Sequence, residues 1–504
     1  MGQEWQMVTT RDRVDAPARA VPPSALVRFA PLLAGLAATA LAAARSFVPS
    51  PWTDEVVTLT LLRRPLGDLL AMLGDVDAVH GLYYVVLRAW AVLAGDGIVA
   101  ARMLSALAIG VAAAGVVVLA RALGAPAAAP WAGAVFVALP VTTWVGSEAR
   151  STALVAAGAV WAGVALVRAI ERGGWWWLGY AALMTVTVGL FVQASLLFLA
   201  HGLAVLWAGG ASRRLLAWAA SAAGVAVVLA PFVLLVLGQR GQVSWLTRPE
   251  PVWVARRIVA LWFGGSPVVA LVVVGLAVLA VVAAWRAGGA RTTALVRLTL
   301  PWLLVPGAVL VAVSWVLEPM FHPRYLVHCC AAMALLAGAG LAAIGRRTWR
   351  IVVAAVLGVA CAVAIAVTSG PYARDLADWR SAADVVAERA EPSDVVLFAP
   401  DRVSDERGPR RAMDAFPGAF DDLDDPGSLP GDGDGHPIWD GGLPVEDVPA
   451  SDLEGEDRVW LLVGMREYPA ESAGALDALE AEGYDGELIW SGPSTEVYLF
   501  SRDG

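Results

Sequence analysis

Residues 99–121 read VAARMLSALAIGVAAAGVVVLAR, an apolar stretch long enough to cross a lipid bilayer as a helix. Its two charged side chains are Arg102 near one end and Arg121 at the other. Comparable apolar runs recur along most of the 504-residue chain. Together with this one they lie at about 25–46, 79–95, 99–121, 126–146, 150–168, 175–190, 191–208, 215–237, 267–285, 298–317, 325–344 and 351–369. The sequence therefore predicts an all-α, polytopic membrane protein.

Composition agrees, because a chain that is 58% hydrophobic and only 16% charged is too apolar for a water-soluble enzyme. Charge divides the chain near Gly370. Residues 371–504 carry 32 of the 45 acidic residues but only 10 of the 36 basic ones, all of them arginines. We expect a flexible cytoplasmic tail at 1–24, a transmembrane domain at 25–370 and an acidic extracytoplasmic domain at 371–504.

Arginine-rich turns set the orientation, because positive residues are retained in the cytoplasm. If all twelve runs crossed the membrane, four such turns would lie outside. Residues 79–95 form the weakest run, short and interrupted by Tyr83, Tyr84, Arg88 and Trp90, a composition typical of an interfacial helix. We therefore predict eleven spans and one external juxtamembrane helix in the plasma membrane. The four turns then face the cytoplasm: Arg168/Arg172, Arg213/Arg214, Arg286/Arg291/Arg297 and Arg346/Arg347/Arg350.

The acidic tail alternates two kinds of pattern. Residues 379–389 and 473–482 are helix-like, whereas 394–398, 458–463 and 496–500 are strand-like, so we expect a small α/β domain. Its middle contains Asp432-Gly433-Asp434-Gly435, which is similar to part of a calcium loop. The spacing of an EF-hand is absent, which argues against a metal there.

Two adjacent carboxylates, Asp54 and Glu55, follow the first apolar run in the stretch Trp52-Thr53-Asp54-Glu55. Carboxylates at membrane depth cost free energy unless they face water or a partner. They are either an interfacial acidic pair or part of an external active site. On the predicted topology other polar residues share their side of the membrane: His80, Arg102, Glu148, Arg150 and Arg324. Polar groups from distant segments therefore converge where a site could form.

The external segments follow a recognisable order: Trp52-Thr53-Asp54-Glu55, Asp77-Ala78-Val79-His80-Gly81-Leu82-Tyr83-Tyr84, Arg102-Met103-Leu104-Ser105, Ser147-Glu148-Ala149-Arg150 and Pro323-Arg324-Tyr325-Leu326. This order resembles the GT-C glycosyltransferases, in particular the protein O-mannosyltransferases, the lipid A aminoarabinose transferase and the bacterial proteins like glycosyltransferase family 39. The resemblance covers most of residues 25–345. It implies a transmembrane catalytic domain, a sugar donor carried on polyprenyl monophosphate, and the acidic pair at the catalytic centre.

The residue types fit that chemistry. Displacing a phosphate from an anomeric carbon needs a base for the acceptor hydroxyl and cations for the departing phosphate. Asp54 is the candidate base, and Glu55 orients it or helps to bind a divalent cation, whose presence the sequence leaves open. The candidate phosphate ligands are Arg102, Arg150 and Arg324. His80, Tyr83, Glu148 and Tyr325 complete the candidate substrate-binding set.

Each of these residues also has a structural interpretation. His80 could bond locally, Glu148 and Arg150 could neutralise one another, and Tyr83 could be an interfacial aromatic. Arg102 and Arg324 could mark the membrane boundary.

The favoured function is an inverting hexosyltransferase, expected to move mannose to a protein, glycan or lipid acceptor outside the plasma membrane. No nucleic-acid partner is expected. The alternatives are a polytopic transporter or lipid flippase, and a binding protein whose spans only anchor it. The lack of an internal repeat and the gathering of charge at one face disfavour a transporter.

Overall fold

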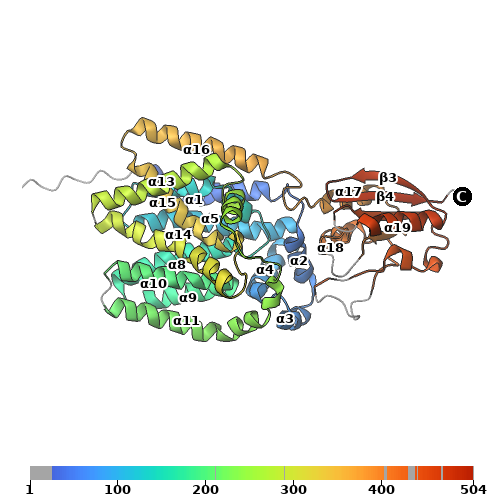
Figure 1. Cartoon of the computed structure of the whole chain (residues 1–504), viewed down its shortest axis with the longest axis horizontal. Helices are drawn as coiled ribbons and strands as arrows, with labels where there is room; N and C mark the ends of the chain where they lie inside the picture. Colours follow the sequence, from blue (N-terminus) through green and yellow to red (C-terminus); the bar gives the residue numbers. More distant parts are fainter. Residues whose placement is uncertain are drawn as a thin grey trace, which may run out of the picture.

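The structure, a computed structural model, describes residues 25–502 except 210–211, 289, 402–405, 430–437, 440 and 467–468. The tail at 1–24 and the calcium-like stretch Asp432–Gly435 lie outside these described residues. Two units follow one another in Figure 1, a long helical bundle and a smaller sheet domain that contains the C-terminal segment.

The bundle helices are α1 (Ala25–Arg45), α5 (Ile98–Ala122), α6 (Ala129–Ala138), α7 (Pro140–Gly146), α8 (Thr152–Arg172), α9 (Trp176–Leu190), α10 (Leu196–Trp207), α11 (Ser212–Gly238), α13 (Pro267–Ala287), α14 (Ala290–Val316), α15 (Cys330–Ala343) and α16 (Arg347–Val367). Small residues let them pack closely. A Cβ on Gly340 would lie 2.0 Å from the carbonyl oxygen of Leu276 in α13, and one on Gly110 would lie 2.0 Å from Thr39 of α1. These two helix pairs can therefore approach only because the residues are glycines.

Seven of the described helices are long and apolar enough to cross a bilayer, and the bent pair α6–α7 would make an eighth. The pair bends by 65° where Pro140 begins α7, because proline disfavours a helical conformation in the residue before it. Helices α1, α9 and α10, which the prediction counted as spans, are not among the seven. The fold class is confirmed as a mostly helical, polytopic membrane protein with a small sheet domain. The count of eleven spans stays a prediction.

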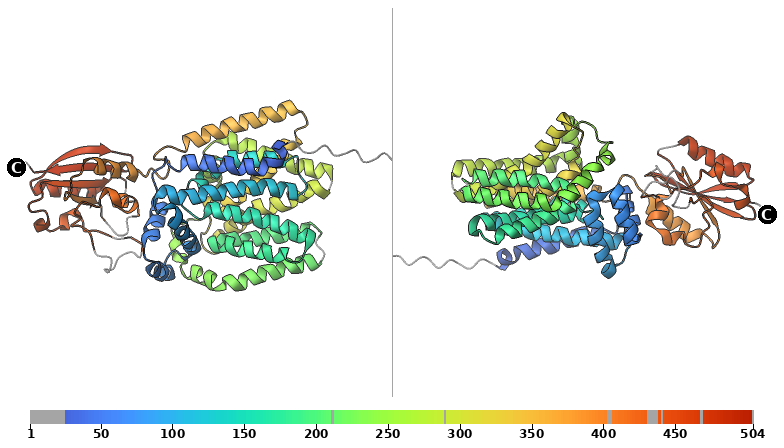
Figure 2. Two further views of the ribbon diagram at one scale, coloured as in Figure 1. Left: turned by 180° about the vertical axis from the view of Figure 1, so that it is seen from behind. Right: turned by 90° about the horizontal axis from the view of Figure 1, so that it is seen from below.

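A layer of short helices lies between the bundle and the sheet domain (Figures 1 and 2). It comprises α2 (Thr53–Arg63), α3 (Leu66–Asp75), η1 (Ala78–His80) and α4 (Gly81–Ala94). Helix α4 corresponds to the run at 79–95 that was predicted not to cross, and its 14 residues are too few for a span. Further short helices flank this layer: η3 (Arg240–Val243), α12 (Pro251–Trp262) and η4 (Pro323–Cys329).

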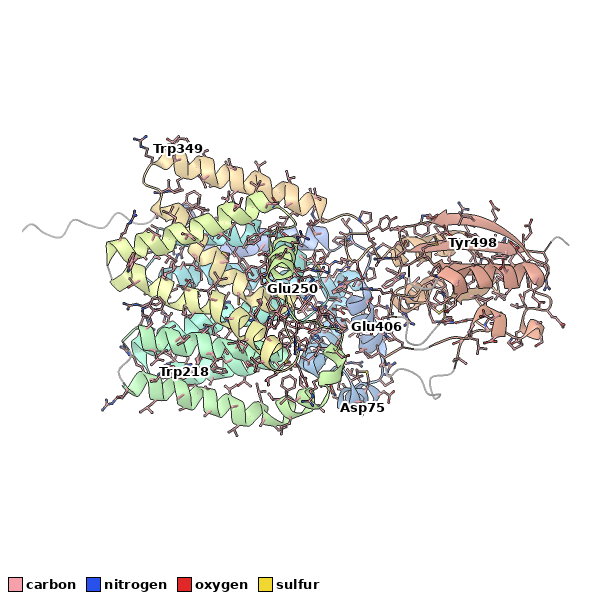
Figure 3. All side chains as sticks on the ribbon, in the orientation of Figure 1. Asp75, Trp218, Glu250, Trp349, Glu406 and Tyr498 are labelled. Atoms are coloured by element: carbon pink, nitrogen blue, oxygen red, sulfur yellow. The ribbon has the colours of Figure 1, made fainter. Side chains whose placement is uncertain are left out.

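The four arginine-rich turns all lie at the bundle end remote from the sheet domain, as the paths of α8, α11, α13 and α16 show (Figures 1 and 2). Trp349, at the start of α16, marks that remote end, whereas Tyr498 lies on the sheet (Figure 3). The arginine-rich turns and the sheet domain are thus separated by the length of the bundle.

The sheet domain contains α17 (Trp379–Arg389), β1 (Val395–Ala399), α18 (Arg411–Ala415), β2 (Arg458–Gly464), α19 (Pro469–Ala481), β3 (Asp485–Ser491) and β4 (Thr495–Ser501). The strand order is β1-β2-β4-β3, with β1 parallel to β2 and the other neighbours antiparallel. Val396 and Phe398 belong to the same apolar cluster as α17 and the bundle, whereas Val395 and Leu397 pack with α19. Because successive residues of a strand face opposite sides, one sheet face is joined to the bundle core and the other is covered by α19.

Candidate active site

The acidic pair occupies the first turn of α2. Trp52 has an extended backbone and ends the incoming loop, so the helix begins at Thr53. Carboxylates in a first turn are stabilised by the positive end of the helix dipole. Successive helical residues point about 100° apart, so the two neighbours enter different surroundings.

Glu55 is fully buried and lies in a closed network. Arg102 of α5 binds it with two prongs, Nε to Oε1 at 2.8 Å and Nη2 to Oε2 at 2.6 Å. The backbone amide of Ala149 donates to Oε1 at 2.8 Å. Burial alone would raise the pKa of Glu55, but Arg102, Arg374 and these hydrogen bonds lower it to about 2. Glu55 is therefore an ionised carboxylate without solvent contact.

Arg102 donates its other hydrogen bonds to the loop before α2. Its Nη1 donates to the carbonyl oxygens of Ser46 and Pro49 at 2.9 and 2.8 Å. Its side chain is 0% exposed. The structure thus places Arg102 behind the acidic pair, where it ties the end of α1 to the start of α2.

Arg374, which the sequence analysis did not single out, is the second cation of this network. It lies in the linker between the two domains, and its Nη1 is 3.6 Å from Glu55 Oε2 and 3.7 Å from Glu148 Oε1. Its Nη2 donates to the carbonyl oxygen of Ser147 at 2.6 Å. Burial, together with the neighbouring Glu55 and Asp54, raises the pKa of Glu148, although Arg374 opposes this.

Asp54 has a different environment, because its side chain is 26% exposed. Nη1 of Arg324 donates to Oδ2 at 2.9 Å, and Nη2 of Arg150 lies 3.9 Å from the same oxygen. Among the described residues, none donates a hydrogen bond to Oδ1. One carboxylate oxygen is thus held by arginines while the other is available.

Arg150 joins the acidic pair to α4. Its Nη1 donates to the backbone oxygen of Asp54 at 3.2 Å and to the hydroxyl oxygen of Tyr84 at 3.3 Å. Tyr84 in turn donates to the carboxylate of Asp77. Burial disfavours the charge on Arg150, but Asp54, Tyr84 and Asp77 more than offset this and raise its pKa.

Tyr83 was predicted from the sequence as a candidate substrate-binding residue, but it is Tyr84 that contacts Arg150. Tyr83 is fully buried beside it, and its hydroxyl has no hydrogen-bond partner among the described residues. The spacing from His80 could have indicated this, because residues four apart share one helix face. The ring centroid of His80 lies 6.4 Å from that of Tyr84 and 5.9 Å from that of Phe191, on which the imidazole stacks.

His80 also pairs with Ser151 through Nδ1 at 3.3 Å. Burial, with the nearby charges of Arg150 and Arg324, holds the pKa of His80 well below its ordinary value. The imidazole is therefore neutral near pH 7 and offers a hydrogen bond rather than a charge.

Arg324 enters from the third side, on η4 after α14. Its side chain is 31% exposed, and its guanidinium carbon lies 5.4 Å from the ring centroid of Trp245 and 5.6 Å from that of Tyr325. Tyr325 also packs on Phe191 at 5.5 Å. The guanidinium is thus held over aromatic faces while it binds Asp54, an arrangement that restricts its movement.

No group of three or more His, Cys, Asp or Glu side chains is arranged to hold a metal ion in the part of the chain that the structure describes. Of the acidic pair, both oxygens of Glu55 are already engaged. Asp54 Oδ1 is therefore the available ligand if a cation binds at this pair.

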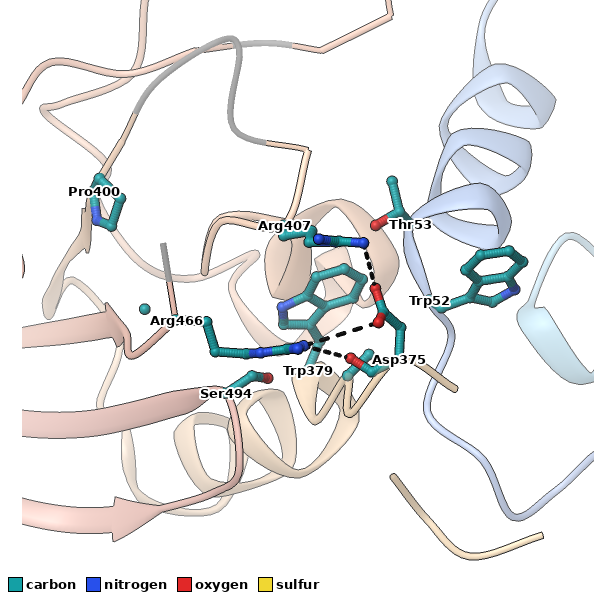
Figure 4. A pocket seen from close by; sticks show the side chains of 10 residues that line it. Trp52, Thr53, Asp375, Trp379, Pro400, Arg407, Arg466 and Ser494 are labelled. Atoms are coloured by element: carbon teal, nitrogen blue, oxygen red, sulfur yellow. Dashed lines mark hydrogen bonds and ion pairs between the residues drawn. The ribbon is translucent and has the colours of Figure 1, made fainter. Parts of the chain in front are cut away.

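A pocket of about 430 Å³, open solvent included, lies between the start of α2 and the sheet domain (Figure 4). Thr53, the residue that precedes Asp54 in the sequence, is part of its lining. The pocket is lined by Trp52, Thr53, Asp375, Ala377, Trp379, Pro400, Arg407, Gly464, Arg466 and Ser494. Asp375 of the linker is 2.9 Å from Arg407, and its backbone oxygen accepts from Arg466 at 2.7 Å. Thr53 donates to the carbonyl oxygen of Glu406, which lies at this junction (Figure 3). The sheet domain is thereby fastened beside the acidic pair.

Solved structures show the same architecture. ArnT from Cupriavidus metallidurans bound to undecaprenyl phosphate superposes with a TM-score of 0.58 at 13% identity, over 94% of this chain and 97% of ArnT. The chain has the GT-C fold. Apo ArnT gives a TM-score of 0.54 at 12% identity, over 93% of this chain and 97% of that one. The mycobacterial arabinofuranosyltransferase AftD gives 0.50 at 17% identity, over 95% of this chain but 42% of AftD.

The sequence matches no protein-family model and no curated protein.

Proposed function

We propose that this protein is a membrane glycosyltransferase that takes a sugar from a polyprenyl monophosphate donor and transfers it to an acceptor hydroxyl outside the plasma membrane. The observation that carries the proposal is the state of Asp54. One of its carboxylate oxygens is fixed by Arg324 and the other is open, at the bundle end where polar residues converge. The ArnT structure with the same fold contains undecaprenyl phosphate, which supports this class of donor.

The donor phosphate binds Arg324, with Arg150 next to it. In the donor this phosphate is a diester that joins the lipid to the sugar, so it carries one negative charge, and a guanidinium binds its two free oxygens in two-pronged fashion. Arg324 then holds the phosphate next to Asp54, whose Oδ1 remains available as the base. When the sugar leaves, the phosphate becomes a monoester with more negative charge, so the arginines bind it more strongly than they bind the donor. Tyr84, already bonded to Arg150, and His80, as a neutral hydrogen-bonding group, border the same space.

Transfer is then a single displacement. Asp54 accepts the proton of the acceptor hydroxyl, the acceptor oxygen forms a bond to the anomeric carbon, and the bond from that carbon to the phosphate oxygen breaks with its electron pair on the phosphate. The arginines stabilise the charge that gathers there. Because one displacement occurs, the anomeric configuration inverts.

Glu55, Arg102 and Glu148 are positioning residues in this proposal. All three are buried behind Asp54 and fix α2 against α5 and the start of α8. Arg102, considered at first as a phosphate ligand, is already saturated by Glu55 and backbone carbonyls. The donor phosphate therefore falls to Arg324 and Arg150.

The resemblance favours a hexose such as mannose, and the acceptor is a hydroxyl of a protein, glycan or lipid. We propose that the acceptor approaches through the pocket lined by Thr53, which we call the acceptor pocket. Thr53 is the neighbour of Asp54 in the sequence, and the pocket also contacts the sheet domain.

The test is turnover of a panel of polyprenyl-phosphate sugars by the full-length protein in lipid. Asp54→Asn keeps the size of the side chain but removes its basicity, so transfer should fall by roughly a hundredfold or more while donor binding persists. Asp68→Asn, an exposed carboxylate of α3, is the matched control. A folded Asp54→Asn protein that binds donor and transfers at the wild-type rate would overturn the proposal.

A further inference from the structure

A second polar recess is lined in part by Arg374. It is formed where α1 ends, where α7 meets the bend at Pro140, and where α16 passes into the linker. The recess and the open solvent in front of it measure about 300 Å³, and its polar lining comprises Arg45, Thr143, Ser147, Thr368, Ser369 and Arg374. None of its lining residues contributes to the acceptor pocket.

Three polar side chains around this recess have donor groups without a hydrogen-bond partner. Arg374 is 2% exposed, yet its Nε makes no hydrogen bond, and its Nη1 makes only the ion contacts to Glu55 and Glu148. The buried hydroxyl of Thr143 is also unpaired. Arg45 forms no side-chain ion pair or hydrogen bond with any residue in the described ranges. Buried donors are rarely left unpaired in folded proteins, so their gathering around one recess indicates a missing acceptor.

The charge of the recess indicates what the acceptor is. Two guanidiniums and no carboxylate line it, and the carboxylates of Glu55 and Glu148 lie 3.6 and 3.7 Å from Nη1 of Arg374, beyond hydrogen-bonding distance. Glu55 is shared with Arg102, which further reduces its hold on Arg374. The recess is therefore cationic, and the unpaired hydroxyl of Thr143 suits an oxygen of a phosphate ester.

The surroundings indicate a lipid as the source of that phosphate. Phe47 and Val48, on the loop after α1, are exposed, as are Val363 and Val367 on the last turns of α16. In the sequence, these apolar residues lie within a few positions of residues that line the recess. In a chain with the bundle in a bilayer, such exposed apolar residues face acyl chains at the outer boundary.

We propose that this recess binds the phosphate headgroup of an anionic phospholipid of the outer leaflet. Its acyl chains lie along the outer end of α16. The lipid phosphate pairs with Arg45 and with Nε of Arg374. Because Arg374 also contacts Glu55 and Glu148, the lipid holds the linker arginine in place behind the acidic pair.

The experiment uses the full-length protein in phosphatidylcholine nanodiscs with increasing phosphatidylglycerol, and native mass spectrometry to count retained phosphatidylglycerol. Arg45→Gln should lower its apparent affinity about tenfold or more, since a charge-assisted contact is lost. Thr143→Val, which removes only the hydroxyl, should lower it severalfold. Arg240→Gln is the matched control, because Arg240 is exposed at the same end of the bundle and does not line the recess.

Loss of one retained phosphatidylglycerol in Arg45→Gln and Thr143→Val, but not in Arg240→Gln, supports the assignment. Equal retention in all four proteins overturns it. Displacement of phosphatidylglycerol by millimolar inorganic phosphate would show a site for free phosphate, and displacement by an equimolar polyprenyl monophosphate would show a site for the donor lipid. Either result also overturns the phospholipid assignment.

Discussion

Replacing Glu55 by Gln removes one negative charge from the buried network in the candidate active site. Arg102 and Arg374 then keep their charges without that carboxylate, in a place without solvent contact. The side-chain shape is nearly unchanged, so packing should survive. The measured effect should therefore report the ionic interaction itself.

The magnitude follows from the pKa of Glu55, about 2 against an ordinary value of 4.5. Each pKa unit corresponds to about 1.4 kcal/mol, so the charged form contributes about 3 kcal/mol at neutral pH. Removing one partner of a buried ion pair typically costs about 3 to 5 kcal/mol, which is the same order. We expect Glu55→Gln to lower the free energy of unfolding at pH 7 by about 3 kcal/mol.

The pH dependence has a definite sign. Because the pKa of Glu55 is depressed in the folded state, its contribution is fully present above pH 4.5 and is lost as the pH falls toward 2. The wild-type protein should lose this stability in that interval, and Glu55→Gln should not.

The assay is denaturant unfolding in detergent micelles followed by tryptophan fluorescence, at several pH values. Glu148→Gln is the matched control, also buried, but its pKa is raised, so removing its charge should cost little or even stabilise the protein. If Glu55→Gln unfolds like the wild type at pH 7, with the same loss of stability between pH 4.5 and 2, the buried network does not contribute as argued.

Three further predictions follow from the site and the topology. Arg324→Gln should weaken donor binding tenfold or more with the fold intact, whereas Arg102→Gln should mainly lower stability, as donor titration and unfolding will show; equal donor affinity in Arg324→Gln and wild type would retire its phosphate role. Tyr84→Phe should reduce transfer severalfold, because it removes the hydroxyl that bonds Arg150, and unchanged kcat and KM would exclude that role. In intact cells an impermeant thiol reagent should label Ser451→Cys on the sheet domain but not Thr348→Cys at the far end of the bundle, and the opposite pattern would reverse the orientation.

Much of the fold was predictable because apolar runs and arginine-rich turns carry strong local signals. The helices of the bundle, the short α4 and four of the five elements expected in the tail lie close to their predicted positions, and the fifth, α19, begins earlier. Strand β3 was missed. Its opening Asp485-Gly486-Glu487 resembles a turn, and as an edge strand exposed along most of its length it lacks an alternating apolar pattern.

The candidate site was predictable in its members but not in their pairing. The structure brings Asp54, Arg150 and Arg324 together. This convergence was predictable because the positive-inside rule assigned all three to one side of the membrane. Which arginine faces Asp54 and which is buried against Glu55 depends on contacts between segments far apart in sequence. A single sequence contains no signal for such pairing, and Arg374, an isolated arginine in a charged tail, gave none either.

The position of Arg374 in the chain also bears on how the protein is made. The ribosome reaches this residue only after every bundle helix has been synthesised. Until then Arg102 is available to pair with Glu55, but Arg374 is not. Seating the linker, with Asp375 bound by Arg407 and Asp378 bound by the amides of Ser494 and Thr495, must await synthesis of the final strand. Newly inserted chains would therefore pass through a stage with all helices in place but without Arg374 beside Glu55 and Glu148, and completion of the candidate site would be the last event of biogenesis.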